Sequence, residues 1–464
     1  MLKYFPSLMS RRAIIYYFIT LFVVSVLYMK YILPFVWILF GAVEVITFFY
    51  FSNVLTQRWQ NISTKTFVSR IFRTSLIIRI LYVIFAYFFY KSMTGQPFMF
   101  SSADEQFYYE MSLVWSEYGF QELVNSIENI GLSDSGEAYW TAFLCNIFGP
   151  HIFPVRIAHA VLSAFTCVLI YRIAHRHFDE PVARMAAVFC MLMPNLVYYC
   201  GMHLKEADMV FLIVFFIDRI DVILTGNKIS FTTILLAVLT AGALFTFRTT
   251  LGAVAIIATL VAVVFNKGKL GAWWKRIVLA FVVIVGLFST SVGDSIMGDI
   301  NEIWEGKETN QSTRLADRAR GNYLVKYASG AVFAPMIFTI PFPTMVNTEG
   351  QENSKMIHGG NFVKNVMSGF TIFALFSLLL SGGWRKHTLL IAVMCGYLVV
   401  IAFSAFAHAE RFHQPVLPFE LMFAACGINM LKPKHMRWFN MWLLFVFVAN
   451  VVWAWFKLKG RGWV

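Results

Sequence analysis

Charged residues are scarce in this chain. Only 14% of its 464 residues are Asp, Glu, Lys or Arg, whereas about a quarter of a typical soluble domain is charged. Hydrophobic residues make up 59% of the chain, and Phe alone occurs 48 times. No soluble fold of this size needs so much apolar surface, so the composition excludes a soluble domain and indicates a protein of the lipid bilayer.

Cysteine is scarce as well, and its six positions lack the spacing of a metal site or of a disulfide framework. We expect all six to be small core residues; they are Cys145, Cys167, Cys190, Cys200, Cys395 and Cys426. A convincing small-residue cleavage site is also missing after the first apolar run, so we expect that run to be retained as a helix.

Long apolar runs dominate what is present, and they approach the ~20 residues that cross ~30 Å of hydrocarbon. The nearly charge-free runs are Ala13–Met29, Tyr31–Phe51, Ile157–Ile173, Phe231–Phe247, Leu251–Phe265 and Ile277–Phe288. Only helices and closed barrels satisfy the backbone in lipid, and these runs lack the alternation of barrel strands. The sequence therefore predicts an all-α, polytopic transmembrane helix bundle. It shows no inverted repeat, which would favour a secondary transporter.

The net charge of +13 is explained by basic cytoplasmic loops, so we expect no nucleic acid partner. The stretch from Ser92 to Ala138 holds no Lys or Arg, which places it on the external side of the membrane. We expect juxtamembrane helices on that side. Alternating loops give about thirteen crossings, although the last, Met441–Phe456, would leave a basic tail outside, against the charge rule. We expect one membrane domain, divided into a hairpin and loop (1–74), a catalytic core (75–292), a long external loop (293–361) and C-terminal helices (362–464).

Two adjacent carboxylates, Asp104 and Glu105, stand at the start of the external stretch, followed by the aromatic residues Tyr108 and Tyr109. A carboxylate at a membrane boundary can act as a general base or ligate a divalent cation. The alternative is an ordinary helix start, with Ser102 as N-cap and both acids favoured by the helix dipole.

A second polar cluster contains His203, Lys205, Glu206 and Asp208, and the predicted topology puts it on the same face. Lys205 could hold a phosphate oxygen as a point charge. The alternative is a plain helix N-terminus, where Glu206 and Asp208 stabilise the dipole. Upstream, His159 is expected to be a satisfied polar residue on a packed helix.

A third cluster, His408 to Pro418, contains Glu410, Arg411, His413 and Pro415. Arg411 offers a planar donor fork suited to phosphate or carboxylate, and Pro415 and Pro418 would break or start a helix. This combination is hard to explain as a mere connector, so the sequence favours a functional role.

The long external loop carries a fourth group, which could bind an anion or form a solvated amphipathic face. Its members are Arg314, Asp317, Arg318, Arg320, Tyr323 and Lys326. The apolar stretch Ala331–Met345, punctuated by proline, is typical of a re-entrant or interfacial helix.

These clusters, in this order, resemble the GT-C superfamily of membrane glycosyltransferases, which includes protein O-mannosyltransferases and aminoarabinose transferases. Ala103–Tyr109 is similar to the acidic element of the first external loop in that family. The other segments that look like family elements are Glu137–Trp140, Ile147–Gly149, Pro154–Arg156, Ala183–Ala186, Met193–Asn195 and Glu410–Pro418. The basic, proline-containing element of the aminoarabinose transferases is absent before Tyr139, where Glu137 stands instead, and two extra helices precede the catalytic loop.

The resemblance implies a sugar donor on a polyprenyl phosphate, with a lipid, glycan or protein as acceptor, at the periplasmic face of a bacterial inner membrane. It makes Asp104 the candidate general base, with Glu105 assisting it or replacing it. Lys205, Arg411 and Arg248 are the candidate phosphate ligands. Candidate substrate contacts are Tyr108, Tyr109, His203, Glu206, Glu410 and His413.

No metal set is clear, although Asp104, Glu105 and Glu206 could bind Mg²⁺ or Mn²⁺. A flippase for a lipid-linked glycan would use the same charges for translocation. An O-antigen polymerase or ligase also uses external Arg and His. Both alternatives stay open on the sequence.

Overall fold

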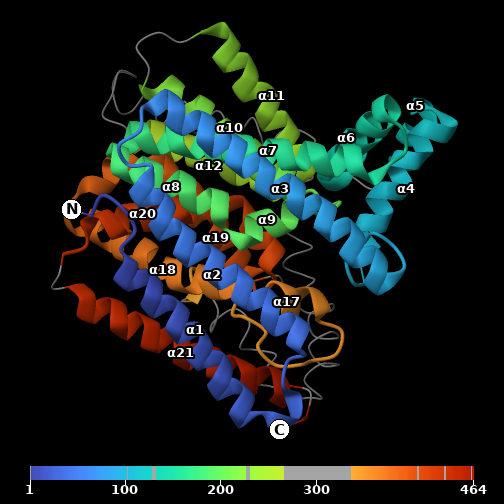
Figure 1. The fold of residues 1–464 in the computed structure, drawn as a ribbon. Coiled ribbons are helices and arrows are strands. Elements are labelled where there is room, and N and C mark those ends of the chain that lie inside the picture. The colour runs from blue at the N-terminus through green and yellow to red at the C-terminus, as the bar shows by residue number, and fades with distance from the viewer. Residues whose placement is uncertain are drawn as a thin grey trace.

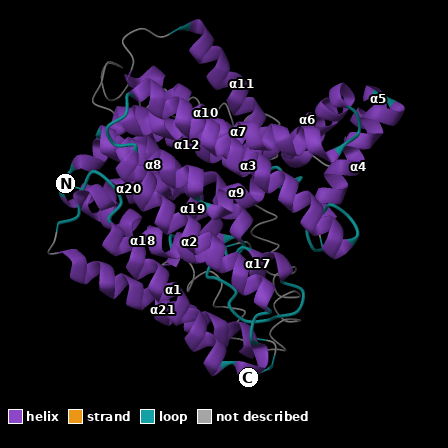
Figure 2. Cartoon of the chain, in the orientation of Figure 1, coloured by secondary structure: helices purple, strands orange, loops and turns teal. Residues whose placement is uncertain are grey.

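The computed structural model describes residues 2–101, 103–127, 132–225, 230–265, 336–404, 407–432, 435–460 and 462–463. In these ranges every regular element is a helix (Figures 1 and 2). The elements are α1 (Ser7–Leu27), η1 (Met29–Tyr31), α2 (Phe35–Arg58), α3 (Thr64–Thr94), α4 (Ala103–Tyr118), α5 (Phe120–Ile127), α6 (Leu132–Phe148), α7 (Ile152–His177), α8 (Glu180–Leu192), α9 (Pro194–Cys200), α10 (Glu206–Thr225), α11 (Phe231–Phe247), α12 (Thr249–Phe265), α17 (Glu352–Met356), α18 (His358–Leu380), η3 (Gly383–His387), α19 (Thr388–Phe403), η4 (Glu410–Val416), α20 (Leu417–Met430) and α21 (Met436–Lys459).

Seven helical segments are long and apolar enough to cross a bilayer, and a bent pair, α8 with α9, would make eight. The seven are α1, α2, α3, α7, α18, η3 with α19, and α21. The predicted all-α membrane bundle is therefore confirmed. The count of thirteen stays a prediction, because the run 277–288 lies outside the described residues and α11 and α12 are shorter apolar helices.

One end of the bundle carries the short helices α4, α5 and α6, which project beside it (Figure 1). We call this the α4 end, and the opposite end the far end. At the α4 end, α6 packs against α4 and α11, and η4 packs against α10. Pro415 lies inside η4, and Pro418 lies in the first turn of α20. Pro418 thus starts a helix as expected, whereas Pro415 lies within the short helix η4 and neither starts nor interrupts it.

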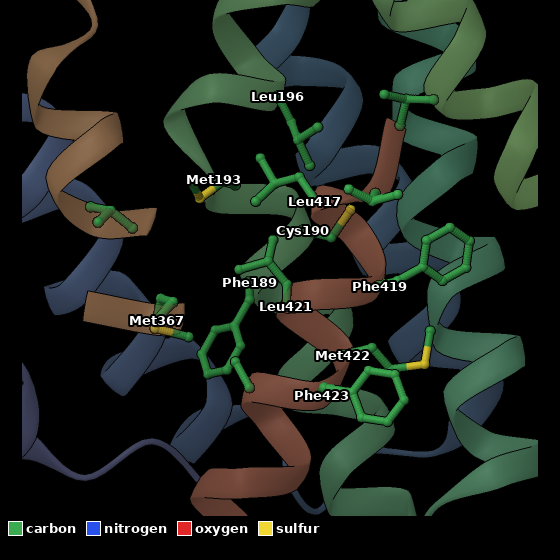
Figure 3. Packing of buried hydrophobic residues seen from close by; sticks show 14 of the residues in the cluster. Phe189, Cys190, Met193, Leu196, Met367, Leu417, Phe419, Leu421, Met422 and Phe423 are labelled. Carbon is green, nitrogen blue, oxygen red and sulfur yellow. The ribbon is translucent and has the colours of Figure 1, made fainter. Parts of the chain in front are cut away.

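The interior is filled by α8, α9, α18 and α20, whose apolar side chains meet in one cluster (Figure 3). Close approach of α18 and α20 depends on Gly427, because a Cβ there would stand 2.1 Å from the carbonyl oxygen of Phe370. Small residues at helix contacts are the usual means of tight packing in membranes. Five of the six cysteines are buried and the sixth is partly buried, as expected of core residues.

The break between α8 and α9 has a clear chemical cause. Pro194 has no N–H to offer the carbonyl of Cys190, so the helix bends by 49° there. The buried guanidinium of Arg79 donates instead to the carbonyl oxygens of Cys190 at 3.3 Å and Met191 at 3.2 Å. The backbone at the bend is thereby satisfied inside the bundle, as the bilayer requires. After the bend, α9 leads directly into the turn that carries His203 and Lys205.

The chain tail lies beside the connection between α1 and α2. Trp463 stacks on Tyr31 with ring centroids 5.0 Å apart, and Lys457 Nζ lies 3.0 Å from Gln351 Oε1. The Arg314–Lys326 group lies outside the described residues. Of the predicted interfacial helix Ala331–Met345, only 336–345 are described, and they form turns and extended chain rather than a continuous helix.

Candidate active site

Helix α4 turns its two adjacent carboxylates in different directions. Successive residues of a helix point about 100° apart, so residues i and i+4 share a face. Asp104 and Tyr108 therefore lie on one side of α4, and Glu105 and Tyr109 lie on the next. Asp104 keeps 49% of its side chain exposed, whereas Glu105 is fully buried. The structure thus gives the two acids different surroundings.

Asp104 forms an ion pair with Arg411 of η4. The guanidinium of Arg411 lies 5.1 Å from the ring centre of Phe412, and that of Arg248 lies 4.5 Å from the same ring, within the range of cation–π attraction. Burial acts to lower the pKa of Arg411, but the carboxylates of Glu206 and Asp104 outweigh it and raise that pKa. The Phe412 ring therefore holds two cations next to the Asp104 carboxylate.

Lys205 completes a group of three cations with Arg248 and Arg411, which we call the cation cluster. Its Nζ donates to the Phe247 carbonyl oxygen at 3.0 Å and forms an ion pair with Asp134. Burial, followed by repulsion from Arg248, lowers the pKa of Lys205 to about 7. The three predicted phosphate ligands thus come together, although they belong to three separate connections between helices.

Arg248 has the loosest acid partner in the cation cluster. Its Nη2 lies 3.9 Å from Glu206 Oε1, which is beyond hydrogen-bond distance. Its Nη1 donates to the Tyr397 hydroxyl at 3.0 Å. Donor capacity therefore remains on Arg248 for an anionic ligand.

Asp134 is a member of the site that sequence reasoning missed. It pairs with Lys205, and the Tyr108 hydroxyl lies 3.4 Å from its Oδ1. Asp134 lies in a long stretch without Lys or Arg, so a cation that pairs with it must come from another segment. That feature of the sequence could have indicated its role.

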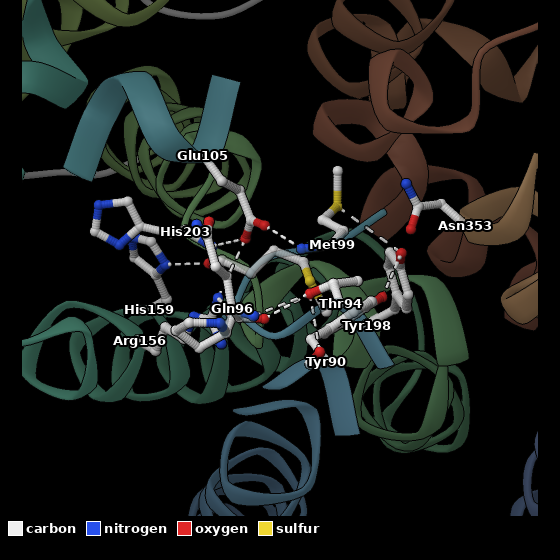
Figure 4. A network of polar contacts seen from close by, with 12 residues as sticks. Tyr90, Thr94, Gln96, Met99, Glu105, Arg156, His159, Tyr198, His203 and Asn353 are labelled. Atoms are coloured by element: carbon white, nitrogen blue, oxygen red, sulfur yellow. Dashed lines mark hydrogen bonds and ion pairs between the residues drawn. The ribbon is translucent and has the colours of Figure 1, made fainter. Parts of the chain in front are cut away.

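Glu105 ties several segments together beneath the surface (Figure 4). Its carboxylate accepts the N–H of Met99 at 2.6 Å and the N–H of His203 at 2.5 Å, and lies 3.4 Å from Arg156 Nη2. Arg156 also donates to the Pro97 carbonyl oxygen at 2.5 Å. These contacts fix the chain before α4 and the turn before α10, which is the work of a positioning residue.

The remaining predicted contacts divide between the surface and the interior. Glu410 is partly buried at the start of η4, next to Arg411. His203 is fully buried, and the Tyr109 hydroxyl donates to the Pro150 carbonyl oxygen at 3.3 Å, away from the cation cluster. His413 lies in the core, where its Nδ1 is 2.9 Å from Lys364 Nζ. The structure therefore brings Tyr108 and Glu206 to the cation cluster, but not His203, Tyr109 or His413.

One group of side chains in the described part of the chain could hold a metal ion. It consists of Glu137, His159 and Asp208, and it does not include the acids Asp104, Glu105 and Glu206 that the sequence suggested. Burial and the charge of Asp208 raise the pKa of Glu137 well above its ordinary value.

The described residues thus form a bundle of apolar helices long enough to cross a membrane, with a carboxylate beside a cation cluster at one end. Residues 136–292 match the family of dolichyl-phosphate-mannose-protein mannosyltransferases. This segment is a GT-C superfamily domain, and the match supports a membrane glycosyltransferase of the GT-C kind. The resemblance seen in the sequence is thereby confirmed.

The matched segment begins in α6 and contains Lys205, Glu206 and Arg248, whereas Asp104 and Arg411 lie outside it. No curated protein and no solved structure matches the chain.

Proposed function

We propose that the protein transfers a sugar from a polyprenyl-phosphate donor to a hydroxyl group at its α4 end, with Asp104 as general base. The acceptor oxygen forms a bond to the anomeric carbon, and the bond from that carbon to the phosphate oxygen breaks. The hydroxyl proton passes to the Asp104 carboxylate, and the bonding electrons leave with the lipid phosphate. The observation that carries this proposal is the ion pair of Asp104 with Arg411, which sets a carboxylate beside the cation cluster.

Asp104 is a better base than Glu105 because it is accessible. A general base must reach the proton that it removes to within hydrogen-bond distance. The Asp104 side chain is 49% exposed, whereas Glu105 is enclosed by Arg156 and two backbone N–H groups. An acceptor can approach the first carboxylate without moving the fold.

The cation cluster is suited to the leaving phosphate. Charge develops on the phosphate as the sugar departs, and preorganised donors lower that barrier. Arg248 retains donor capacity, and Arg411 offers a second guanidinium beside the Phe412 ring. Lys205 adds a point charge whose pKa of about 7 makes it sensitive to pH.

The membrane setting supports a donor with a lipid part. The matched family is named for transfer from dolichyl phosphate to protein, and we carry over only the class of donor, a sugar on a lipid phosphate. A fully membrane-embedded bundle lets the prenyl chain lie between helices. The acceptor we propose is a hydroxyl of a lipid, glycan or protein.

The first experiment measures transfer in detergent with purified protein and radiolabelled polyprenyl-phosphate sugars. We expect turnover by the wild type and by Glu110→Gln, which changes an exposed acid on the same helix. Asp104→Asn should bind donor but show no turnover. Full turnover by that variant contradicts the base assignment. A flippase would give no product in detergent, because translocation needs two leaflets.

The orientation we propose places the α4 end in the periplasm of a bacterial inner membrane. The support is the absence of Lys and Arg from residues 92–138. A membrane-impermeant maleimide added to intact spheroplasts should label Glu122→Cys, which is exposed beside α4, and should spare Lys65→Cys, which is exposed at the start of α3. The reverse pattern contradicts this orientation.

A further inference from the structure

Three helices each direct one metal-binding side chain toward a common point. Glu137 of α6, His159 of α7 and Asp208 of α10 offer ligand atoms that all lie within 4.8 Å of one another. His159 Nε2 lies 2.9 Å from Asp208 Oδ2 and 3.7 Å from Glu137 Oε1. Two ligands about 2.1 Å from a tetrahedral ion stand roughly 3.4 Å apart. The observed separations lie on either side of that value.

The orientation of His159 suits a ligand. Its Nδ1 lies 3.0 Å from the Met202 carbonyl oxygen, so Nδ1 carries a proton and donates it to that oxygen. In the neutral imidazole the lone pair is then on Nε2, which faces the two carboxylates. Histidines that bind metals are oriented by this kind of second hydrogen bond. A lone pair 2.9 Å from a carboxylate oxygen is repelled by it. A proton or a metal ion must therefore lie between or beside the two atoms.

Apart from His159, no cationic side chain among the described residues pairs with Glu137 or Asp208. Glu137 and Asp208 have exposures of 0% and 2%. Both oxygens of Glu137, and Oδ1 of Asp208, have no hydrogen-bond partner among the described residues. The neighbouring cations pair elsewhere, Arg156 with Glu105 and Lys205 with Asp134. Burial of charge is costly unless the charge is paired or coordinates a metal.

We propose that Glu137, His159 and Asp208 bind one divalent transition-metal ion, of the Zn²⁺ or Mn²⁺ type. A single imidazole with two carboxylates suits these ions, whereas Mg²⁺ and Ca²⁺ prefer oxygen ligands alone. The ion links α6, α7 and α10. Asp134 lies three residues before Glu137, and Glu206 two residues before Asp208, so the ion positions the acids that contact the cation cluster.

The proposal is separate from the proposed transfer reaction, and its first test needs no substituted protein. The full chain is purified in detergent from cells grown with zinc and manganese, and its metal content is measured by inductively coupled plasma mass spectrometry. We expect about one ion per chain, with a fall in Tm when a chelator removes it and recovery when Zn²⁺ or Mn²⁺ returns. A metal-free protein whose Tm changes with neither chelator nor added ion overturns the proposal. In that case a proton shared by Glu137 and Asp208 explains how the two acids lie close together.

Variants then locate the ion. Glu137→Gln, His159→Gln and Asp208→Asn should each lower the bound metal by about tenfold or more, and their Tm should no longer respond to chelator. His203→Gln is the matched control, because this buried imidazole lies 6.5 Å from the His159 ring, between ring centroids, but is not in the ligand group. It should keep the ion. Metal that stays bound in all three ligand variants is adventitious and overturns the assignment.

Discussion

Arg411 of η4 forms an ion pair with Asp104 of α4, although 307 residues separate them in the chain. The pair joins the first helix after α3 to the connection that precedes α20. It therefore brings the proposed base and one proposed phosphate ligand together at the α4 end. The same arginine lies beside Phe412, whose ring also contacts Arg248.

Substitution of Arg411 should slow transfer, and the loss should be larger when both the charge and the planar donor fork are removed. Arg411→Ala should lower kcat/KM by about 10²–10³-fold, the usual effect of removing one group that stabilises charge in the transition state. Arg411→Lys should lose less, because it keeps the charge but not the planar fork. The control is Arg385→Lys in the exposed part of η3 at the far end, which should retain full activity. Equal activity in Arg411→Ala and wild type contradicts a phosphate role.

Glu105 should matter for stability, whereas Asp104 should matter for turnover. Glu105→Gln removes one partner of a fully buried ion pair with Arg156, and breaking such a pair costs about 3–5 kcal/mol. We expect a clearly lower Tm in detergent for this variant and an unchanged Tm for Asp104→Asn. If Glu105→Gln instead keeps its Tm and loses all turnover, Glu105 is the base and the assignment of the two acids is reversed.

Loop charge was enough to predict from the sequence that Asp104, Lys205 and Arg411 share one end of the bundle. A membrane allows each connection only two sides, so alternating crossings place loop residues without any knowledge of packing. Loop charge alone does not predict the direction in which an individual side chain points. Whether Asp104 or Glu105 faces the cation cluster depends on how α4 is rotated about its axis, and this is set by packing against α6.

The proposed metal ligands could not be predicted from the sequence for the same reason. Glu137, His159 and Asp208 come from three helices, and their meeting depends on the register of α6, α7 and α10. The sequence indicates only a satisfied polar residue of a packed helix at His159. His413, expected near the substrate, turns inward because Lys364 and the Ala407 carbonyl oxygen accommodate its two ring nitrogens in the core.

Donor binding should weaken as the pH rises through about 7. Burial and the neighbouring Arg248 lower the pKa of Lys205 to about 7, and Arg411 acts in the same direction, while Glu206 and Asp104 oppose it. The ammonium is therefore present below this pH and is lost above it. A hydrogen bond to a charged group contributes about 1.5–3 kcal/mol, so KM for donor should rise roughly tenfold or more.

The measurement is KM for donor against pH in the wild type and in Lys205→Arg. Arginine stays charged throughout this range, so the variant should lose the dependence near neutrality. A dependence that persists unchanged in Lys205→Arg assigns the titration to another group.

Arg79 should stabilise the fold through the bend between α8 and α9. Arg79→Leu leaves the carbonyl oxygens of Cys190 and Met191 without their donor, and an unsatisfied backbone group at membrane depth costs several kcal/mol. We expect a large fall in Tm. In the double variant with Pro194→Ala, the new N–H can bond to the Cys190 carbonyl oxygen and the helix can straighten locally, so part of the lost Tm should return. Additive losses in the double variant would show that Arg79 acts through another contact, such as Ser163, whose hydroxyl accepts from Arg79 Nε at 2.7 Å.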